Sequence, residues 1–229
     1  MAQYDKIAKF YDDLMGDVGD VPHTFLIDPL MSSFLPPKRD LTVLDLGCGN
    51  GYWTKLLAQK YKKVVGVDNS KKLIQIAKNK RQLSNIEYKL VEIESDFPFI
   101  NNSFDLIFSN MVLHYVKDLN KLIQELHRVV KPNGLFLVSF VHPIFESNKN
   151  SSLKSIKTRT PYKTSTLGGL AELTLYYQPL ESIIKNFLNA DFKLIHQKDA
   201  IITTDLVEKY PKYKEYIGLP RAVILVFRK

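Results

Sequence analysis

Short apolar runs alternate with stretches of helical spacing between residues 41 and 141, and this alternation constrains the fold more than any other feature. Strand–helix–strand units joined by short turns form a parallel sheet with helices on both faces. Two further apolar runs follow after a gap in the pattern. We therefore predict an α/β fold with a doubly wound, mostly parallel, seven-stranded sheet. The predicted strands cover 41–46, 64–67, 86–91, 104–109, 135–141, 192–202 and 222–227.

The predicted helices have recognisable ends. The Ser70 hydroxyl can cap the helix that follows the second strand. Lys131-Pro132-Asn133-Gly134 stops the helix predicted over 119–130, because Pro cannot continue it and Gly134 suits a left-handed cap. Further helices are predicted over 51–60, over 180–189 and within 1–36.

The length of 229 residues fits one large domain better than two independent enzymes. We predict a single domain over 1–229, with an N-terminal helical cap over 1–36. The strand–helix rhythm lapses over 143–174, where 148–169 is rich in Ser, Thr, Lys and Asn and ends in Gly168-Gly169. A structureless stretch of this length is typical of a functional lid or a disordered insert. We predict a basic, lid-like insert there.

Composition narrows the class of protein further. Hydrophobic residues at 45% and charged residues at 24% are typical of globular chains, and the apolar runs are too short to span a bilayer. The first residues lack the profile of a signal peptide. The single cysteine, Cys48, cannot form an internal disulfide, and no metal-ligand spacing occurs. We expect a cytoplasmic monomer or homodimer without a metal site and without membrane association.

The strongest local signal is the loop Val43-Leu44-Asp45-Leu46-Gly47-Cys48-Gly49-Asn50-Gly51, between a predicted strand and a predicted helix. Glycines there let the backbone turn sharply and approach a ligand closely. A dinucleotide site is disfavoured, because Tyr52 stands where its motif needs a small residue and Asp45 would repel a pyrophosphate. The loop also lacks the Gly-Lys-Ser/Thr ending of a phosphate loop.

Two acidic residues favour a ligand with positive charge. Asp45 precedes the loop, and Asp68 ends the second strand, 17 residues after Gly51. A carboxylate in the place of Asp68 can accept both hydroxyls of a ribose. S-adenosylmethionine combines an amino group, a sulfonium cation and a ribose. We therefore predict it as the cofactor, with S-adenosylhomocysteine as its product.

Three motifs occur in order along the chain: Val-Leu-Asp-Leu-Gly-Cys-Gly-Asn-Gly, Val-Val-Gly-Val-Asp and Asp-Phe-Pro-Phe-x-x-x-Ser-Phe-Asp-Leu-Ile. Together they resemble the class I S-adenosylmethionine-dependent methyltransferases, and more narrowly their small-molecule "type 11" branch. The resemblance covers 4–141 and implies a Rossmann-like methyltransferase fold and methyl transfer to a small molecule. It continues weakly through 176–189 and the Leu219-Pro220-Arg221 turn, and the insert at 148–169 has no match.

The resemblance implies roles for individual residues. Asp45 would face the methionine amino group, directly or through water, and Asp68 would take the ribose hydroxyls with Asn69 beside the adenine. After the third strand, Glu92-Ile93-Glu94 stands one residue out of register with the family's Asp-Ala, so either Glu92 or Glu94 would meet the adenine. The other predicted cofactor contacts are Gly47, Cys48, Gly49, Asn50, Gly51, Asn110 and Tyr11, the last of which could equally be a core residue.

Two histidines at strand ends are the candidates for catalysis. His114 follows the fourth strand and His142 the fifth. A general base helps when the methyl acceptor must lose a proton. We predict a catalytic role for one or both, against the alternative that each only satisfies backbone groups.

The charge distribution predicts the class of substrate. Residues 147–229 carry 14 Lys or Arg against 7 Asp or Glu, whereas residues 1–146 carry 18 against 17. A lid that places Lys154, Lys157 and Arg159 over the pocket would favour an anionic small molecule. The alternatives are an RNA (tRNA) methyltransferase, which lacks support from an Asn-Pro-Pro-Tyr type motif, a non-catalytic cofactor-binding regulatory protein, and a nicotinamide oxidoreductase.

Overall fold

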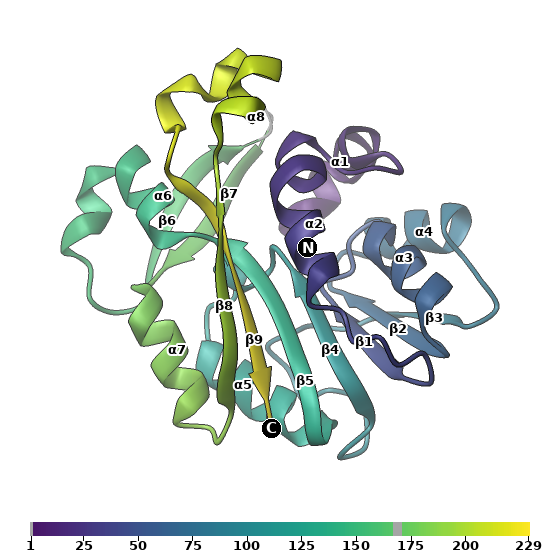
Figure 1. The fold of residues 1–229 in the computed structure, drawn as a ribbon. Helices are drawn as coiled ribbons and strands as arrows, with labels where there is room; N and C mark the ends of the chain where they lie inside the picture. Colours follow the sequence, from purple (N-terminus) through teal and green to yellow (C-terminus); the bar gives the residue numbers. More distant parts are fainter. Residues whose placement is uncertain (1, 167–170) are drawn as a thin grey trace.

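The computed structural model describes residues 2–166 and 171–229 (Figure 1). Its main sheet has seven strands in the order β3-β2-β1-β4-β5-β9-β8. Neighbouring strands from β3 to β5 are parallel, whereas β9 runs antiparallel to both β5 and β8. The predicted sheet is therefore confirmed. The strands are β1 (Thr42–Leu46), β2 (Lys63–Asp68), β3 (Ile86–Leu90), β4 (Phe104–Asn110), β5 (Val130–Val141), β8 (Lys193–Ile201) and β9 (Pro220–Arg228).

Helices cover both faces of the sheet and produce two hydrophobic cores (Figure 1). Successive side chains of a strand point to opposite faces. Val43 accordingly packs in the core under α2, α3 and α4, and its neighbour Leu44 packs in the core under α5 and α7. These helices are α2 (Asp28–Ser33), α3 (Tyr52–Lys60), α4 (Lys71–Lys80), α5 (Leu119–Val129) and α7 (Leu180–Leu188).

The predicted helix ends are confirmed, with one change in detail. The Ser70 hydroxyl accepts a hydrogen bond from the N–H of Leu73 at 3.2 Å, and α5 ends at Val129. The left-handed residue of the following turn is Asn133, with φ of 63°, rather than the predicted Gly134. Gly134 is needed for space instead, because a Cβ there would lie 2.7 Å from Cγ2 of Val130.

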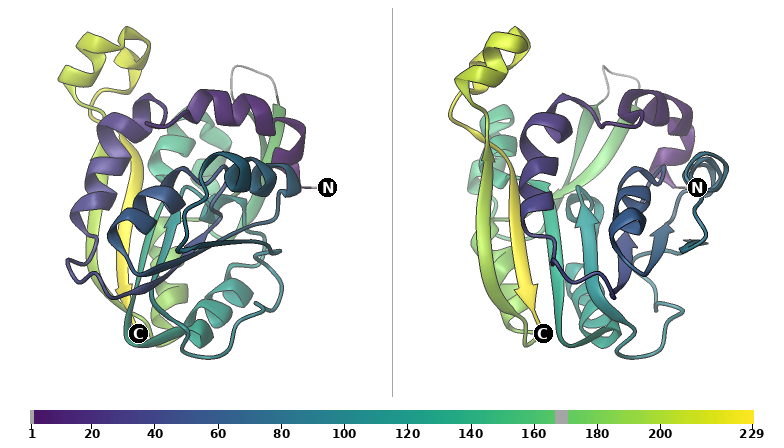
Figure 2. Two further views of the ribbon diagram at one scale, coloured as in Figure 1. Left: turned by 90° about the vertical axis from the view of Figure 1, so that its right-hand side faces the viewer. Right: turned by 45° about the vertical axis from the view of Figure 1, so that its right-hand side comes forward.

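The N-terminal segment crosses the end of the sheet at which the parallel strands terminate (Figure 2). A buried ion pair fixes it there: Arg81 Nη1 and Asp12 Oδ1 lie 2.8 Å apart, and both side chains are 4% exposed. Asn50 of the glycine loop donates to the same carboxylate at 2.9 Å. The segment is thereby bonded to both α4 and the loop. Its elements before α2 are η1 (Gln3–Lys6), α1 (Ala8–Met15) and η2 (His23–Ile27).

The segment predicted to lack structure contains regular elements, so that prediction was wrong. An antiparallel hairpin pairs β6 (Thr160–Thr166) with β7 (Ala171–Tyr177), while Gly168 and Gly169 lie outside the described residues. Of the two hairpin strands, β7 has the apolar alternation that marks a half-buried strand, and its Leu173 and Leu175 are buried. Before the hairpin come α6 (Pro143–Lys149) and η4 (Ser151–Ser155).

The remaining elements complete the sheet edge. Short helices α8 (Thr204–Lys209) and η6 (Pro211–Tyr216) connect β8 to β9, and η3 (Leu113–Tyr115) follows β4. Within the part of the chain that the structure describes, no helix is long and apolar enough to cross a membrane.

Candidate active site

A cavity of about 270 Å³ lies at the carboxyl ends of the parallel strands, whereas a second cavity holds only about 20 Å³. The strand order reverses between β1 and β4, which is where ligands bind in doubly wound sheets. The large cavity is therefore the candidate site. Ten of the predicted site residues line it: Tyr11, Gly47, Gly49, Asp68, Asn69, Glu92, Ile93, Glu94, Asn110 and His114.

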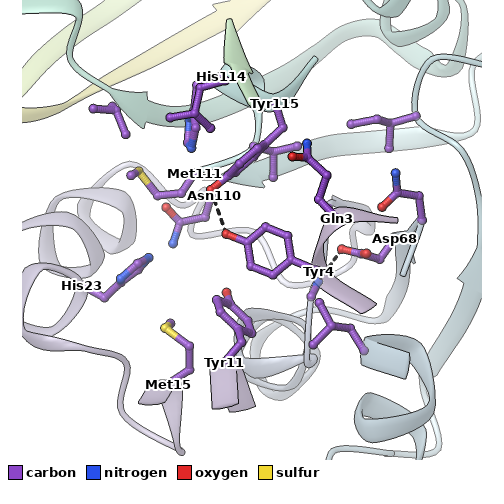
Figure 3. Close-up of a pocket in the computed structure, with 18 of the residues that line it drawn as sticks. Gln3, Tyr4, Tyr11, Met15, His23, Asp68, Asn110, Met111, His114 and Tyr115 are labelled. Atoms are coloured by element: carbon purple, nitrogen blue, oxygen red, sulfur yellow. Dashed lines mark hydrogen bonds between the residues drawn. The ribbon is translucent and has the colours of Figure 1, made fainter. Parts of the chain in front are cut away.

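Asp68 ends β2 and faces this cavity with a carboxylate that backbone amides hold in place (Figure 3). The N–H of Gly49 donates to Oδ2 at 2.9 Å, and the N–H of Ser70 donates to Oδ1 at 2.8 Å. Each oxygen keeps capacity for a further hydrogen bond. Burial, reinforced by the charge of Asp5, raises the pKa of the carboxyl to about 6. The group suits a ligand that offers two hydroxyls or a positive charge.

The glycine loop approaches the cavity through Gly47 and Gly49. Both adopt left-handed φ values, 71° and 55°. A Cβ on Gly47 would lie 2.3 Å from Cγ2 of Val112, a distance that no side chain tolerates. Glycine at this position therefore serves both the turn and the close packing.

Four other predicted loop residues, Asp45, Cys48, Asn50 and Gly51, do not line the cavity, and their roles in cofactor binding stay predictions. Asp45 accepts the hydroxyl of Thr54 at 2.6 Å, and burial raises its pKa to about 7. Asn50 binds Asp12, as described above. The other two residues pack within the protein. Cys48 is buried, and a Cβ added at Gly51 would lie 2.5 Å from the Tyr88 hydroxyl.

The ends of β2 and β3 form a polar wall. The side-chain amide of Asn69 donates to Oε2 of Glu92 at 3.3 Å. Glu94 instead accepts the N–H of Asp118, the N-cap residue of α5. The two glutamates, which the sequence could not tell apart, thus differ in their partners: Glu92 pairs with Asn69, and Glu94 supports a helix.

The end of β4 is held rigidly. Asn110 donates to Oδ1 of Asp28 at 3.4 Å and accepts the hydroxyl of Ser139. The next residue, Met111, has φ of 60°, which is uncommon outside glycine. Its N–H donates to the carbonyl of Ser139 at 2.9 Å. This turn presents Met111 to the cavity (Figure 3).

Three tyrosines line the cavity and contact one another. The hydroxyl oxygens of Tyr4 and Tyr115 lie 2.7 Å apart (Figure 3). The Tyr4 ring packs edge-on against Tyr11, with 5.2 Å between centroids. Burial raises the pKa of Tyr4 and of Tyr11 well above the ordinary value, so both hydroxyls stay protonated. Sequence reasoning missed Tyr4, because it lies in η1 and Tyr11 lies in α1, so no common helix periodicity marks the pair.

The two predicted catalytic histidines differ in position. His114 lines the cavity, and burial and the charges of Arg221 and Arg159 lower its pKa to about 3, so it is neutral at pH 7. His142 caps α6: its Nδ1 accepts the N–H of Ile144 at 3.1 Å, and it is not part of the cavity wall. His142 thus caps a helix through Nδ1, and a catalytic role for it stays a prediction.

A further histidine, not singled out by the sequence, lines the cavity with its acidic partner. His23 Nδ1 lies 2.7 Å from Oδ1 of Asp20, which also accepts the N–H of His23 at 3.1 Å. Because a carboxylate only accepts, Nδ1 is the donor and Nε2 is left to accept a proton. Figure 3 shows His23 on the side of the cavity opposite Asp68.

The basic residues of the insert are placed differently from the prediction. Arg159 donates to the carbonyls of Leu113 and Val116, and burial lowers its pKa to about 10. It therefore anchors the hairpin to the end of β4. Lys154 and Lys157 are exposed and do not line the cavity. The cations that do line it are Lys149 of α6 and Arg221 of β9.

Comparison with known proteins agrees with this geometry. Residues 44–138 match the family model described as a methyltransferase domain. These residues are therefore similar to methyltransferase domains. A putative S-adenosylmethionine-dependent methyltransferase from Listeria monocytogenes superposes on this chain with a TM-score of 0.75 at 21% identity. The superposition covers 88% of this chain and 95% of that structure, and it establishes the shared fold.

Two relatives give the closer sequence likeness. Malonyl-[acyl-carrier protein] O-methyltransferase 1 of Coxiella burnetii is 38% identical over 141 residues, which cover 59% of this chain and 45% of the relative. Ubiquinone biosynthesis O-methyltransferase of the same species is 31% identical over 151 residues, covering 62% and 64%. This chain thus spans about half the length of the first relative.

Proposed function

We propose that the protein transfers the methyl group of S-adenosylmethionine to a small acidic molecule. The observation that carries the proposal is the Asp68 carboxylate, held by two backbone amides beside the glycine turn and open to two further donors. A ribose supplies two hydroxyls in this arrangement. The two relatives are named as O-methyltransferases, which supports an oxygen atom as the acceptor.

Different residues of the cavity would bind different parts of such a cofactor. Asp68 would accept the ribose hydroxyls, and Asn69 with Glu92 would face the adenine. The backbone at Gly47 and Gly49 would lie along the methionine part. The carboxyl of Asp68 lines the cavity and has a raised pKa, and a cationic ligand beside it would stabilise its charged form.

The opposite half of the cavity would hold the acceptor. When bound, S-adenosylmethionine supplies a methyl group on a cationic sulfur, which leaves with the electron pair of the broken bond. The protein has to align the acceptor, exclude water and take up a proton if the acceptor is a hydroxyl. The Nε2 atom of His23, oriented by Asp20, is placed to accept that proton. Tyr4, Tyr11 and Tyr115 exclude water from the same space.

The proposal is tested with the purified protein, isotope-labelled S-adenosylmethionine and three acceptor pools: small carboxylic and phosphorylated metabolites, neutral metabolites, and transfer RNA. We expect label in the acidic small-molecule pool, and we expect Asp68→Ala to abolish it. Label in transfer RNA would replace the proposal with the RNA alternative. Cofactor binding without label in any pool would favour a regulatory cofactor-binding protein.

A further inference from the structure

We propose that Arg221 and Lys149, both set against the ring of Phe145, form the subsite that binds the anionic group of the methyl acceptor. This inference rests on the proposed function for the identity of the acceptor, but the anion subsite is a property of these side chains. This subsite takes the place of the one predicted from the sequence, which consisted of Lys154, Lys157 and Arg159.

Arg221 carries the first part of the inference. It is the second residue of β9, and its backbone carbonyl accepts the N–H of His142 at 3.3 Å, so its position is tied to the end of β5. Its side chain lines the cavity, and its buried Nη1 has no hydrogen-bond partner among the residues that the structure describes. A buried guanidinium nitrogen without an acceptor is costly, and a ligand oxygen would remove that cost.

Phe145 carries the second part, because two cations that line the cavity contact its ring. The guanidinium carbon of Arg221 lies 4.8 Å from the centroid of the Phe145 ring, and Nζ of Lys149 lies 5.7 Å from the same centroid. Both distances are within the range of cation–π contacts. The ring thus connects two positive charges that line the same cavity.

The acidic residues of this wall already have donors. Asp20 accepts from His23, and Oε2 of Glu146 accepts the hydroxyl of Tyr162 at 2.6 Å. Neither forms an ion pair with Arg221 in the part of the chain described here. The positive charge of Arg221 nevertheless helps to lower the pKa of Asp20 and of His114.

The ligand chemistry follows from the donors. A guanidinium presents parallel N–H groups that match a carboxylate or a phosphate, and a nearby ammonium adds a point charge. His114 has an unpartnered buried Nδ1 on the same cavity, among the described residues, and offers a further polar contact to the bound acid. We expect an acceptor with one ionised carboxyl or phosphate group at this wall and its methyl-accepting atom toward Met111 and His23.

The test measures binding of simple anions by calorimetry, with and without S-adenosylhomocysteine. The probes are malonate for carboxylates, inorganic phosphate for phosphates, and malonamide as the uncharged counterpart of malonate. The variants are Arg221→Met, Arg221→Lys and Lys149→Met, with Lys154→Met as the matched control because that lysine is exposed outside the cavity. Circular dichroism establishes that each variant is folded.

We expect malonate, phosphate or both to bind saturably and malonamide not to bind. Arg221→Met should weaken anion binding by at least ~10-fold, Lys149→Met by less, and Lys154→Met not at all. If Arg221→Met does not fold, Arg221→Lys and Lys149→Met decide the outcome. The inference is overturned if the wild-type protein binds neither anion, or if the cavity variants and Lys154→Met behave alike. Failure of S-adenosylhomocysteine to bind the wild type, with anion binding intact, would instead overturn the proposed function alone.

Discussion

The hydroxyl oxygens of Tyr4 and Tyr115 lie 2.7 Å apart and join the N-terminal segment to η3. A second link connects the same segment to β7: the side chain of Gln3 accepts the N–H of Thr174 at 2.7 Å and donates to its carbonyl at 3.2 Å. The N-terminal segment and β7 lie far apart in sequence, and we propose that these links close the site (Figure 2).

Removing the tyrosine link should loosen this closure. In Tyr4→Phe the ring packing is kept and one hydrogen bond is lost, so we expect S-adenosylhomocysteine affinity to fall by about 2–10-fold, mainly through faster dissociation. Stopped-flow displacement measures that rate. Tyr61→Phe is the matched control, since its hydroxyl donates to the Pro36 carbonyl outside the cavity. Equal dissociation rates for both variants and the wild type would show that the link does not close the site.

The glycine loop should tolerate no side chain at Gly47. Gly47→Ala forces a left-handed alanine and a Cβ contact of 2.3 Å with Val112, so we expect a loss of stability well above ~1 kcal/mol together with loss of cofactor binding. Gly218→Ala is the control, because it has φ of 79° but open space around its Cβ. It should lose only the backbone cost, about 1 kcal/mol, in chemical denaturation. Equal losses in the two variants would contradict the close approach of Val112.

The sequence predicted the sheet, the Ser70 cap, and the cavity positions of Gly47 and Asp68, because these depend on local periodicity and on a loop motif. The prediction failed where contacts between segments distant in sequence determine the position of a side chain. The sequence predicted Arg159 to be a cation of the lid that binds substrate, but its guanidinium donates to backbone carbonyls of the η3 region. His142 was predicted as a site residue, and in the structure it caps α6, a helix that the sequence did not predict.

Other site residues have no local signal at all. Asp20 lies between α1 and η2, and His23 is the first residue of η2. Their pairing is seen only in the structure, where both line the cavity. Arg221 belongs to the last strand, and only the antiparallel insertion of β9 beside β5 brings it to the carboxyl end of the sheet.

The pH dependence of stability should reveal the two buried acids. Asp45 and Asp68 have folded-state pKa values of about 7 and about 6, above the unfolded value of about 4. The folded protein therefore binds more protons than the unfolded chain between pH ~4 and pH ~7, and stability falls as pH rises through this window. We expect Asp45→Asn to gain about 1–3 kcal/mol relative to the wild type between pH 4.5 and 7.5, measured by urea unfolding.

A control separates this effect from a general charge effect. Asp40 is exposed and has a lowered pKa because of Lys62, so Asp40→Asn should show no gain over the same window. A pH-independent difference between Asp45→Asn and the wild type would contradict the raised pKa.

Calorimetric titration of S-adenosylhomocysteine tests the central claim most directly, namely that the Asp68 cavity binds the nucleoside of the cofactor. The wild type, Asp68→Ala and Asp96→Ala are compared; Asp96 is a fitting control because its side chain is 90% exposed and does not line the cavity. We expect saturable binding by the wild type and by Asp96→Ala, and at least ~100-fold weaker binding by Asp68→Ala, since two hydrogen bonds to a charged group are lost. Unchanged affinity in Asp68→Ala, or no binding by the folded wild type, would contradict the account.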